Sequence, residues 1–375
     1  MGVPPMAETR ALYDAILTDS VPVDTLTPTP PPPGPSLSSP IAPRQLESHL
    51  PSTNAPINAP IPFIGRSVEL QHLRELASQP QLLLLEGEPG IGKTRFAEEF
   101  IRMSEMLSLT GSARELEQSL PYQPVIEALR GLLHHPLWPS LRAELSLAPV
   151  WLEETARLLP ELHPASGAWE AFPRPGLPGI LGSSAESRLW EGITRFLAAV
   201  AGHRPILIFI DDLQWADEST LALLGYFLRH THRAPITFLA ASRPPSSRSP
   251  LSGFLHSLSR ENRITRISLG LFPPADIQTL AEILAPQTPT PLAEWLTHHS
   301  EGNPLVVAEL IRYARDQGIL TSNGLNPERL STDPIVPQTV YGLIQSRLLR
   351  LSEEARRIFD VAVVVGRKFD FDLVQ

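Results

Sequence analysis

One eight-residue segment constrains the fold of this chain more than any other. Residues Gly87–Thr94 read GEPGIGKT, directly after the continuous apolar run Gln81–Leu85 and before a helical pattern over Thr94–Met106. This is the sequence G-x-x-x-x-G-K-[ST] between a strand and a helix, where glycines let successive backbone N–H groups point at a phosphate. The segment therefore predicts an α/β fold with a phosphate-binding loop after a buried strand.

The residue types in this loop suit a nucleotide. Lys93 can place a mobile charge on the β- and γ-phosphates, and the Thr94 hydroxyl can bind Mg²⁺. Only two of the 31 basic residues are lysines, Lys93 and Lys368. One of these rare lysines stands in the loop, at the position where a slender ammonium fits better than a guanidinium. The residues predicted to contact the nucleotide here are Gly87, Pro89, Gly90, Ile91, Gly92, Lys93, Thr94 and Arg95.

Two adjacent carboxylates end another apolar strand, predicted over Pro205–Ile210. Burying Asp211 and Asp212 without a cation would be costly, and the carboxyl edge of a parallel sheet also carries the phosphate loop. Asp211 is predicted to hold Mg²⁺ beside Thr94, and Asp212 to orient or deprotonate the attacking water. The alternative role, an acidic cap for the next helix, suits Asp217 better.

A third strand, over residues 236–241, is followed by Ser242 and Arg243. Its end should lie at the same edge of the sheet. Arg243 is either a sensor of the γ-phosphate or a solvated loop cation, and the residues alone leave both interpretations open.

The whole pattern predicts an open, mostly parallel five-stranded sheet covered by helices. The strands are predicted at 81–85, 107–113, 205–210, 236–241 and 263–269. One helix is predicted before the first strand, at 67–78, and the helices between the strands at 94–106, 124–133, 186–201, 218–231 and 251–258, with a loop at 163–184. From Pro273 onward only helical patterns remain, which predicts a smaller helical domain.

Prolines mark a linker. The chain has 41 prolines in 375 residues, and thirteen of them lie between Val21 and Pro62. Such a segment does not pack a core and samples extended polyproline conformations, so a spacer is favoured over a docking site for a polyproline-binding partner. One helix, Ala7–Leu17, is predicted before it.

Composition excludes several classes of protein. The absence of cysteine excludes disulfide scaffolds and thiolate chemistry. The longest apolar runs are far shorter than the roughly 20 residues of a membrane span, and the N-terminus lacks the apolar core of a signal peptide. A net charge of −9 argues against non-specific nucleic-acid binding. A cytoplasmic location without membrane contact is therefore predicted.

Five segments together resemble the STAND class of AAA+-like P-loop ATPases, as found in bacterial SARP- or LuxR-type transcriptional regulators. The segments are FIGRSVEL at 63–70, the phosphate loop at 87–94, LPYQP at 120–124 with Glu127-Ala128-Leu129, DDLQWAD at 211–217 and EGNPL at 301–305. The resemblance covers about residues 61–375. It implies ATP or ADP with Mg²⁺ as cofactors.

The resemblance also implies where the adenine lies. In the family the entry motif and the G-x-P element flank the base, which makes Ile64, Gly65, Arg66 and Pro304 candidates for the base pocket. An apolar slot with a backbone hydrogen-bonding edge suits adenine. The alternatives are that Phe63 and Ile64 form a hydrophobic staple on the following helix, and that residues 302–304 simply begin a helix.

The resemblance divides the chain into five parts. Residues 1–20 resemble the last helix of an activator domain, 21–60 form the linker, 61–271 the ATPase domain, 272–350 a helical lid and 351–375 the start of a winged-helix domain. Both ends look cut, so a fragment of a longer regulator is expected. A protein partner or self-association is expected in that regulator, and DNA contact only through domains absent here.

The leading hypothesis is a switch that binds ATP, hydrolyses it slowly and gates a regulator, with Lys93, Asp212 and Arg243 as the catalytic candidates. One alternative is a continuously cycling AAA+ motor or loader, which requires an arginine from a neighbouring subunit. Another is an inactive scaffold that only docks partners. The intact set of Lys93, Thr94, Asp211 and Asp212 argues against the scaffold.

Overall fold

The computed structural model describes residues 60–77, 79–162, 183–231, 233–321, 324–326 and 356. The predicted helix Ala7–Leu17 and nearly all of the linker lie outside the described residues. The same holds for most of the loop 163–184, for the end of the predicted lid from residue 327, and for the predicted winged-helix start except Arg356.

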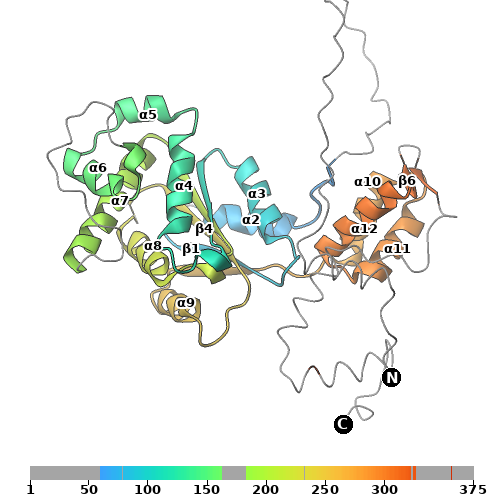
Figure 1. Ribbon diagram of the computed structural model, residues 1–375. Coiled ribbons are helices and arrows are strands. Elements are labelled where there is room, and N and C mark those ends of the chain that lie inside the picture. The colour runs from blue at the N-terminus through green and yellow to red at the C-terminus, as the bar shows by residue number, and fades with distance from the viewer. Residues whose placement is uncertain are drawn as a thin grey trace, which may run out of the picture. The chain divides into compact units, whose positions relative to one another are not determined.

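Five strands form one sheet in the order β2-β3-β4-β1-β5, and every pairing in it is parallel. Figure 1 shows β1 and β4 within this sheet. The strands are β1 (Leu82–Glu86), β2 (Leu107–Ser112), β3 (Ile206–Asp211), β4 (Ile236–Ser242) and β5 (Ile264–Ser268). The predicted five-stranded sheet is confirmed. In the register, Glu86 pairs with Ser242 and Ile210 with Ala240, so the carboxyl ends of β1, β3 and β4 share one edge.

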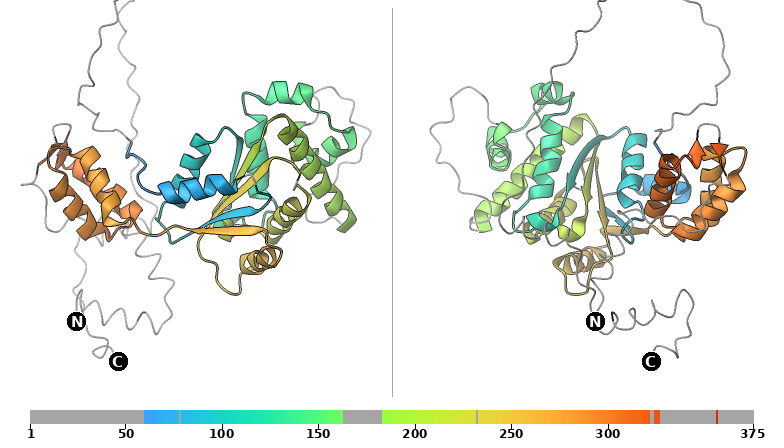
Figure 2. Two further views of the ribbon diagram at one scale, coloured as in Figure 1. Left: turned by 180° about the vertical axis from the view of Figure 1, so that it is seen from behind. Right: turned by 45° about the vertical axis from the view of Figure 1, so that its right-hand side comes forward.

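Helices cover both faces of this sheet (Figure 2). Alternate strand residues face opposite ways, so Leu83 and Leu85 pack with α2 and α3, whereas Leu82 and Leu84 belong to the larger core that includes α4 to α9. The helices are α2 (Ser67–Leu76), α3 (Lys93–Met103), α4 (Gln123–Leu133), α5 (Trp138–Glu144), α6 (Pro149–Ala156), α7 (Ser183–His203), α8 (Glu218–His230) and α9 (Pro250–Arg260). The 3₁₀ turns that accompany them in the described part of the chain are η1 (Glu115–Glu117), η2 (Pro160–Leu162) and η3 (Leu213–Trp215).

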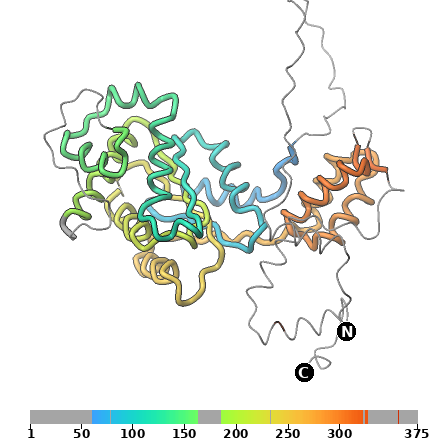
Figure 3. The backbone as a smooth tube through the Cα atoms, in the orientation of Figure 1, coloured from blue at the N-terminus to red at the C-terminus, as the bar shows by residue number. Residues whose placement is uncertain are grey.

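Three further helices have a hydrophobic core of their own. They are α10 (Pro274–Leu284), α11 (Pro289–Ser300) and α12 (Pro304–Asp316), and each begins with a proline in its first turn, where no N–H is needed. Ile61 and Ile64 pack against this core although they lie more than 200 residues earlier. In Figure 3 the blue start of the described chain runs beside the orange segments. The start of the described chain is thereby held against α10 to α12.

The prediction of helices alone after Pro273 is wrong. A two-stranded antiparallel sheet follows α12, with β6 at Leu320–Thr321 and β7 at Gly324–Leu325. Leu320 and Leu325 pair with each other and are both buried in the core of α10 to α12. Strands of two residues are too short to show an alternating pattern, so periodicity does not reveal them.

Gly111 allows β2 and α4 to approach closely. A Cβ atom at this position would lie 1.9 Å from the carbonyl oxygen of Pro124 in α4. The substitution Gly111→Ala is therefore expected to lower the free energy of unfolding by about 1–3 kcal/mol, because the helix must move away from the strand. Urea denaturation followed by circular dichroism measures this loss.

Gly131 in α4 provides the matched control for this substitution. Nothing lies within 4 Å of a Cβ atom at Gly131. Since alanine is favoured over glycine within a helix by about 0.5–1 kcal/mol, Gly131→Ala should leave stability unchanged or increase it. Equal losses for the two variants would contradict the proposed close approach at Gly111.

Candidate nucleotide-binding site

The loop after β1 has the backbone conformation that its glycines allow. Gly90 has φ = 80° and Gly92 has φ = 90°, both in the left-handed region that other residues rarely adopt. Gly92 is also the N-cap of α3, so the first N–H groups of that helix face the loop. At the start of the loop, a Cβ atom on Gly87 would lie 2.8 Å from the carbonyl oxygen of Leu269. The segment therefore has the geometry of a phosphate-binding loop.

Lys93 is the cation of this loop. Its Nζ donates hydrogen bonds to the carbonyl oxygens of Gly87 at 3.0 Å and Glu88 at 3.2 Å, and the residue is buried. Burial lowers the pKa of Lys93, while the nearby carboxylate of Asp212 acts in the opposite direction. The ammonium therefore lies inside the loop near the carboxylates of Asp211 and Asp212, in a position to bind a phosphate held by the loop.

Thr94 and Asp211 meet although they are far apart in the sequence. The Thr94 hydroxyl donates a 2.7 Å hydrogen bond to Oδ2 of Asp211, whose Oδ1 accepts one from the backbone N–H of Asp212 at 2.9 Å. Burial raises the pKa of Asp211, and the bond from Thr94 counteracts this shift. A divalent cation would compensate the cost of burying the ionised carboxylate.

These oxygens fit Mg²⁺. The ion prefers oxygen ligands, and with a nucleotide it takes only one or two of them from the protein, the rest being phosphates and water. No cluster of three or more His, Cys, Asp or Glu side chains that could hold a metal is found among the residues that the structure describes. Thr94 and Asp211 are the residues that would hold the ion.

Asp212 follows β3 in a left-handed conformation, with φ = 51°. Its Oδ1 accepts a 2.7 Å hydrogen bond from Nε2 of Gln214, and Oε1 of Gln214 accepts one from the backbone N–H of Arg243 at 3.0 Å. The ends of β3 and β4 are therefore linked by a side chain. Asp217, six residues after Asp211, caps α8 by accepting from the N–H of Thr220, in agreement with the prediction for this residue.

A cavity of about 920 Å³ connects these groups. Its size is at the upper end of the range usual for small-molecule sites, about 300–1,000 Å³. Most of the predicted site residues line it, namely Ile64, Arg66, Pro89, Gly90, Ile91, Gly92, Lys93, Thr94, Arg95, Asp212, Arg243 and Pro304. Gly65, Gly87 and Asp211 are not among the lining residues, although Asp211 bonds to Thr94, which is.

The entry segment lies at the side of the cavity near α10 to α12. Ile64 is buried in the core of these helices, whereas Phe63 packs against the core that includes Leu70 and Leu73 of α2, so only Phe63 agrees with the predicted staple. Arg66 has φ = 61°, donates to the Gly270 carbonyl and to Glu69, and lies with its guanidinium 5.4 Å from the ring centre of Phe272. Gly65 has φ = 67°, and a Cβ atom there would overlap the side chain of Asp276. The segment thus packs against the connection between β5 and α10.

The start of α12 touches the phosphate loop. Asn303 caps this helix by accepting from the N–H groups of Leu305 at 3.0 Å and Val306 at 3.4 Å. The N–H of Leu305 also donates to the Gly90 carbonyl at 3.0 Å. Residues 302–304 therefore do begin a helix, as the alternative stated, and the same residues contact the loop.

Three charged cavity residues of α12 were missed by sequence reasoning. Arg312, Arg315 and Asp316 line the cavity together with Pro304 and Ala308. The spacing of 304, 308, 312 and 315 is that of one helix face, and this signal could have identified them once Pro304 was chosen. They lie near the C-terminal end of α12 and add charge to the part of the cavity that is farthest from the phosphate loop along this helix.

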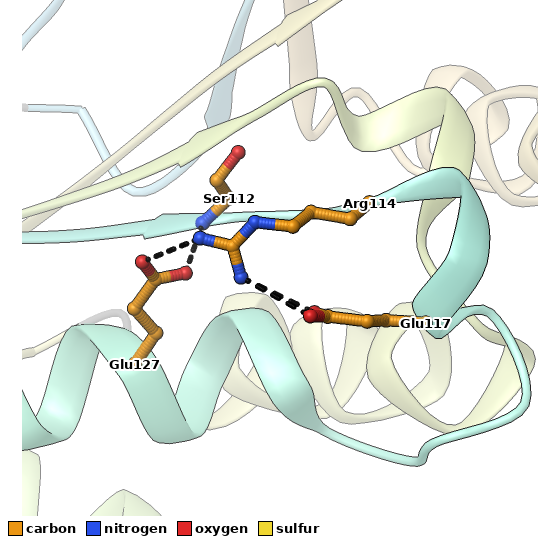
Figure 4. Close-up of polar contacts among 4 residues, drawn as sticks. All are labelled: Ser112, Arg114, Glu117 and Glu127. Carbon is orange, nitrogen blue, oxygen red and sulfur yellow. Dashed lines mark hydrogen bonds and ion pairs between the residues drawn. The ribbon is translucent and has the colours of Figure 1, made fainter. Parts of the chain in front are cut away.

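A second polar network holds the end of β2 (Figure 4). Glu127 of α4 accepts from the backbone N–H of Ser112 at 2.9 Å and from Arg114 at 3.2 Å, and Arg114 also pairs with Glu117. The charge of Glu127 is the largest cause that raises the pKa of Arg114. The next N–H, that of Ala113, donates to the Asp211 carbonyl at 3.0 Å. The network thus supports the strand end that carries Asp211.

The cap of α12 leads to a prediction about stability and binding. Asn303→Ala removes the side chain that accepts from Leu305 and Val306, and loss of an N-cap costs about 1 kcal/mol of stability. Because α12 begins against the phosphate loop, the variant should also bind nucleotide more weakly. Ser249→Ala, which removes the cap of α9, should lower stability alike and leave binding unchanged. Thermal denaturation and calorimetric titration with MgATP separate the two effects.

Within the described residues, no helix has the length and apolar character required to cross a membrane.

Comparison with known proteins agrees with this geometry. A family model described as an AAA ATPase domain matches residues 62–239. The chain is also 24% identical over 341 residues to an uncharacterized protein of Rhizobium meliloti (strain 1021), an alignment that covers 84% of this chain. The chain spans 30% of the length of that relative, which is therefore a much longer protein.

Solved structures share the fold at low sequence identity. The Walker-type ATPase PABY2304 of Pyrococcus abyssi superposes with a TM-score of 0.51 and 17% identity, covering 81% of this chain and 80% of that one. The Aeropyrum pernix ORC2 protein, solved in ADPNP–ADP complexes, gives a TM-score of 0.50 and 13% identity, covering 82% and 77%. The loop and the all-parallel sheet give this chain the P-loop NTPase fold, and its residues 62–239 are similar to the AAA ATPase domain family.

Proposed function

We propose that this chain is a nucleotide switch: it binds ATP with Mg²⁺, hydrolyses it slowly and changes the position of α10 to α12 according to the nucleotide held. The observation that carries the proposal is a cavity lined both by Lys93, Thr94 and Asp212 and by residues of α12. A ligand that touches both parts can favour one arrangement of α10 to α12 only if it binds that arrangement more tightly than the other. ATP and ADP can therefore favour different arrangements only if their contacts in the cavity differ. The γ-phosphate, present in ATP and absent in ADP, supplies that difference.

Each residue has a defined task in this proposal. Lys93 neutralises the β- and γ-phosphates, and the N–H groups of residues 90–94 bind the phosphate oxygens. Bound Mg²⁺, held by Thr94 and Asp211, would neutralise charge that develops on the phosphates. Asp212 orients the attacking water and accepts its proton. Arg243 lies where it can contact the γ-phosphate, since it lines the same cavity as Lys93 and Asp212.

The base is proposed to lie between the entry segment and α12. Ile64, Arg66 and Pro304 line this part of the cavity, with Ala308 one turn further along α12. Apolar side chains beside backbone polar groups suit adenine. Gly65 is proposed to let the backbone turn here, since it has a positive φ and no room for a side chain.

The role of the switch in a larger protein is also a proposal. The resemblance to STAND regulators suggests a cytoplasmic signalling protein in which the nucleotide state controls a protein partner or self-association, with DNA bound by other domains. The much greater length of the Rhizobium relative is compatible with additional domains in proteins of this kind.

The nucleotide content of the purified chain tests the switch. The protein is denatured and its released nucleotides are quantified by chromatography, and the steady-state rate of phosphate release is measured in parallel. A switch should retain close to one ADP per chain and turn over slowly. Rapid turnover by a ring-shaped oligomer would contradict the switch and support a motor.

A further inference from the structure

Gln214 bridges the ends of two neighbouring strands. Its Nε2 donates to Oδ1 of Asp212 after β3 at 2.7 Å, and its Oε1 accepts from the backbone N–H of Arg243 after β4 at 3.0 Å. Both partners line the nucleotide cavity. We infer that Gln214 is a positioning residue for hydrolysis, which fixes the Asp212 carboxylate relative to Arg243. This inference rests on the proposed function.

A side-chain amide of this length can make both bonds. The acceptor at Asp212 requires a donor, the N–H of Arg243 requires an acceptor, and the glutamine amide carries one of each. The two partners also fix which way the amide points, because the reverse orientation would set Oε1 against the carboxylate and Nε2 against an N–H group. A glutamate keeps the acceptor but places a second carboxylate against Asp212.

The backbone of Asp212 makes such a support necessary. Its φ of 51° and ψ of 41° lie in the left-handed region, and its side chain does not cap η3, although the residue stands at the N-cap position. Such a conformation costs energy for a residue other than glycine and persists only where neighbouring groups hold it. The bond from Gln214 holds the carboxylate in place of the missing cap.

The turn that carries Gln214 is itself fixed at both ends. The N–H of Trp215 donates to the Asp212 carbonyl at 2.9 Å, and the N–H of Ala216 donates to the Leu213 carbonyl at 3.1 Å. Asp217 then caps α8 and also accepts from the N–H of Tyr122 at 3.3 Å. Gln214 therefore extends from a short, anchored turn, which suits a side chain that must hold another in position.

Gln214 contacts neither the phosphate loop nor Thr94 through any hydrogen bond seen among the described residues. Nucleotide affinity is therefore expected to survive its replacement, while the rate of hydrolysis falls. A displacement of about 1 Å at a catalytic group can lower a rate about 100-fold. We expect Gln214→Leu to hydrolyse ATP about 10–100-fold more slowly, with a dissociation constant for MgATP within about threefold of wild type.

The experiment measures single-turnover hydrolysis and calorimetric affinity for wild type, Gln214→Leu and Gln71→Leu. Gln71 is the matched control, because its Nε2 also donates to a carboxylate, Glu75 at 3.1 Å, but on the exposed surface of α2. Gln71→Leu should match wild type in both measurements. Gln214→Glu should be at least as slow as Gln214→Leu.

A double-mutant cycle with Asp212→Asn separates positioning from folding. If Gln214 acts through Asp212, adding Gln214→Leu to Asp212→Asn should change the remaining rate by less than about twofold. An equal fall in both backgrounds, or a parallel loss of affinity and thermal stability in Gln214→Leu, would overturn the inference while leaving the proposed function intact. Wild-type protein that binds no ATP would instead overturn the proposed function, and the inference with it.

Discussion

Lys93→Ala is expected to weaken ATP binding at least about 100-fold. Hydrogen bonds to charged groups contribute about 1.5–3 kcal/mol each, and an ammonium between the β- and γ-phosphates makes two of them. Each 1.4 kcal/mol corresponds to a factor of about ten in affinity, so the loss of both contacts accounts for the expected change. Isothermal titration with MgATP measures it.

The control for Lys93→Ala removes a positive charge from the same helix. Arg102 lies at the end of α3, with 70% of its side chain exposed, and pairs with Glu99. Arg102→Ala should therefore leave the affinity for ATP unchanged. If Lys93→Ala binds ATP as wild type does, the phosphate loop is not the site of nucleotide binding and the proposed function fails.

The strands of the sheet were predictable because each is buried on both faces. The four leucines of β1, for example, form a continuous apolar run that admits no amphipathic helix, and all four are fully or almost fully buried. The predicted end of this strand is one residue early, since Glu86 continues the ladder by pairing with Ser242 and Ser268. The apolar pattern ends at Leu85 because the next residue is charged, whereas the backbone pairing of the strand continues through Glu86.

Short elements and distant contacts were not predictable in the same way. Helices α5 and α6 have seven and eight residues, too few for a clear helical period. Ile64 belongs to a core formed by residues more than 200 positions later, which no local pattern reveals. The two-residue strands β6 and β7 depend likewise on packing against α10 to α12 rather than on their own propensity.

The residues of the candidate site also differ in how well the sequence alone predicts them. The phosphate loop was predictable because its characteristic residues lie within eight consecutive positions of the sequence. Thr94 and Asp211 required one further step, the rule that the carboxyl ends of parallel strands share an edge. Gln214 and Glu127 carry no local signal of their tasks, since each bonds to a backbone N–H group that only the fold brings near.

The second prediction with a large expected effect concerns catalysis rather than binding. Asp212→Asn should lower the rate of ATP hydrolysis about 100- to 10,000-fold, the range over which a positioned general base contributes. The amide oxygen of asparagine can still accept from Gln214, so the turn after β3 should keep its shape. ATP affinity should stay within a few-fold of wild type, because Lys93 and Thr94 are unchanged.

A carboxylate-to-amide change far from the cavity serves as the control for Asp212→Asn. Glu144 of α5 has 68% of its side chain exposed and lies 3.5 Å from His203. Glu144→Gln should hydrolyse ATP at the wild-type rate, measured by single-turnover release of phosphate. A wild-type rate for Asp212→Asn would remove Asp212 from the reaction and leave water activation to another group. A slow rate with full affinity would assign the two neighbouring carboxylates different tasks, Asp211 holding the cation and Asp212 acting on the water.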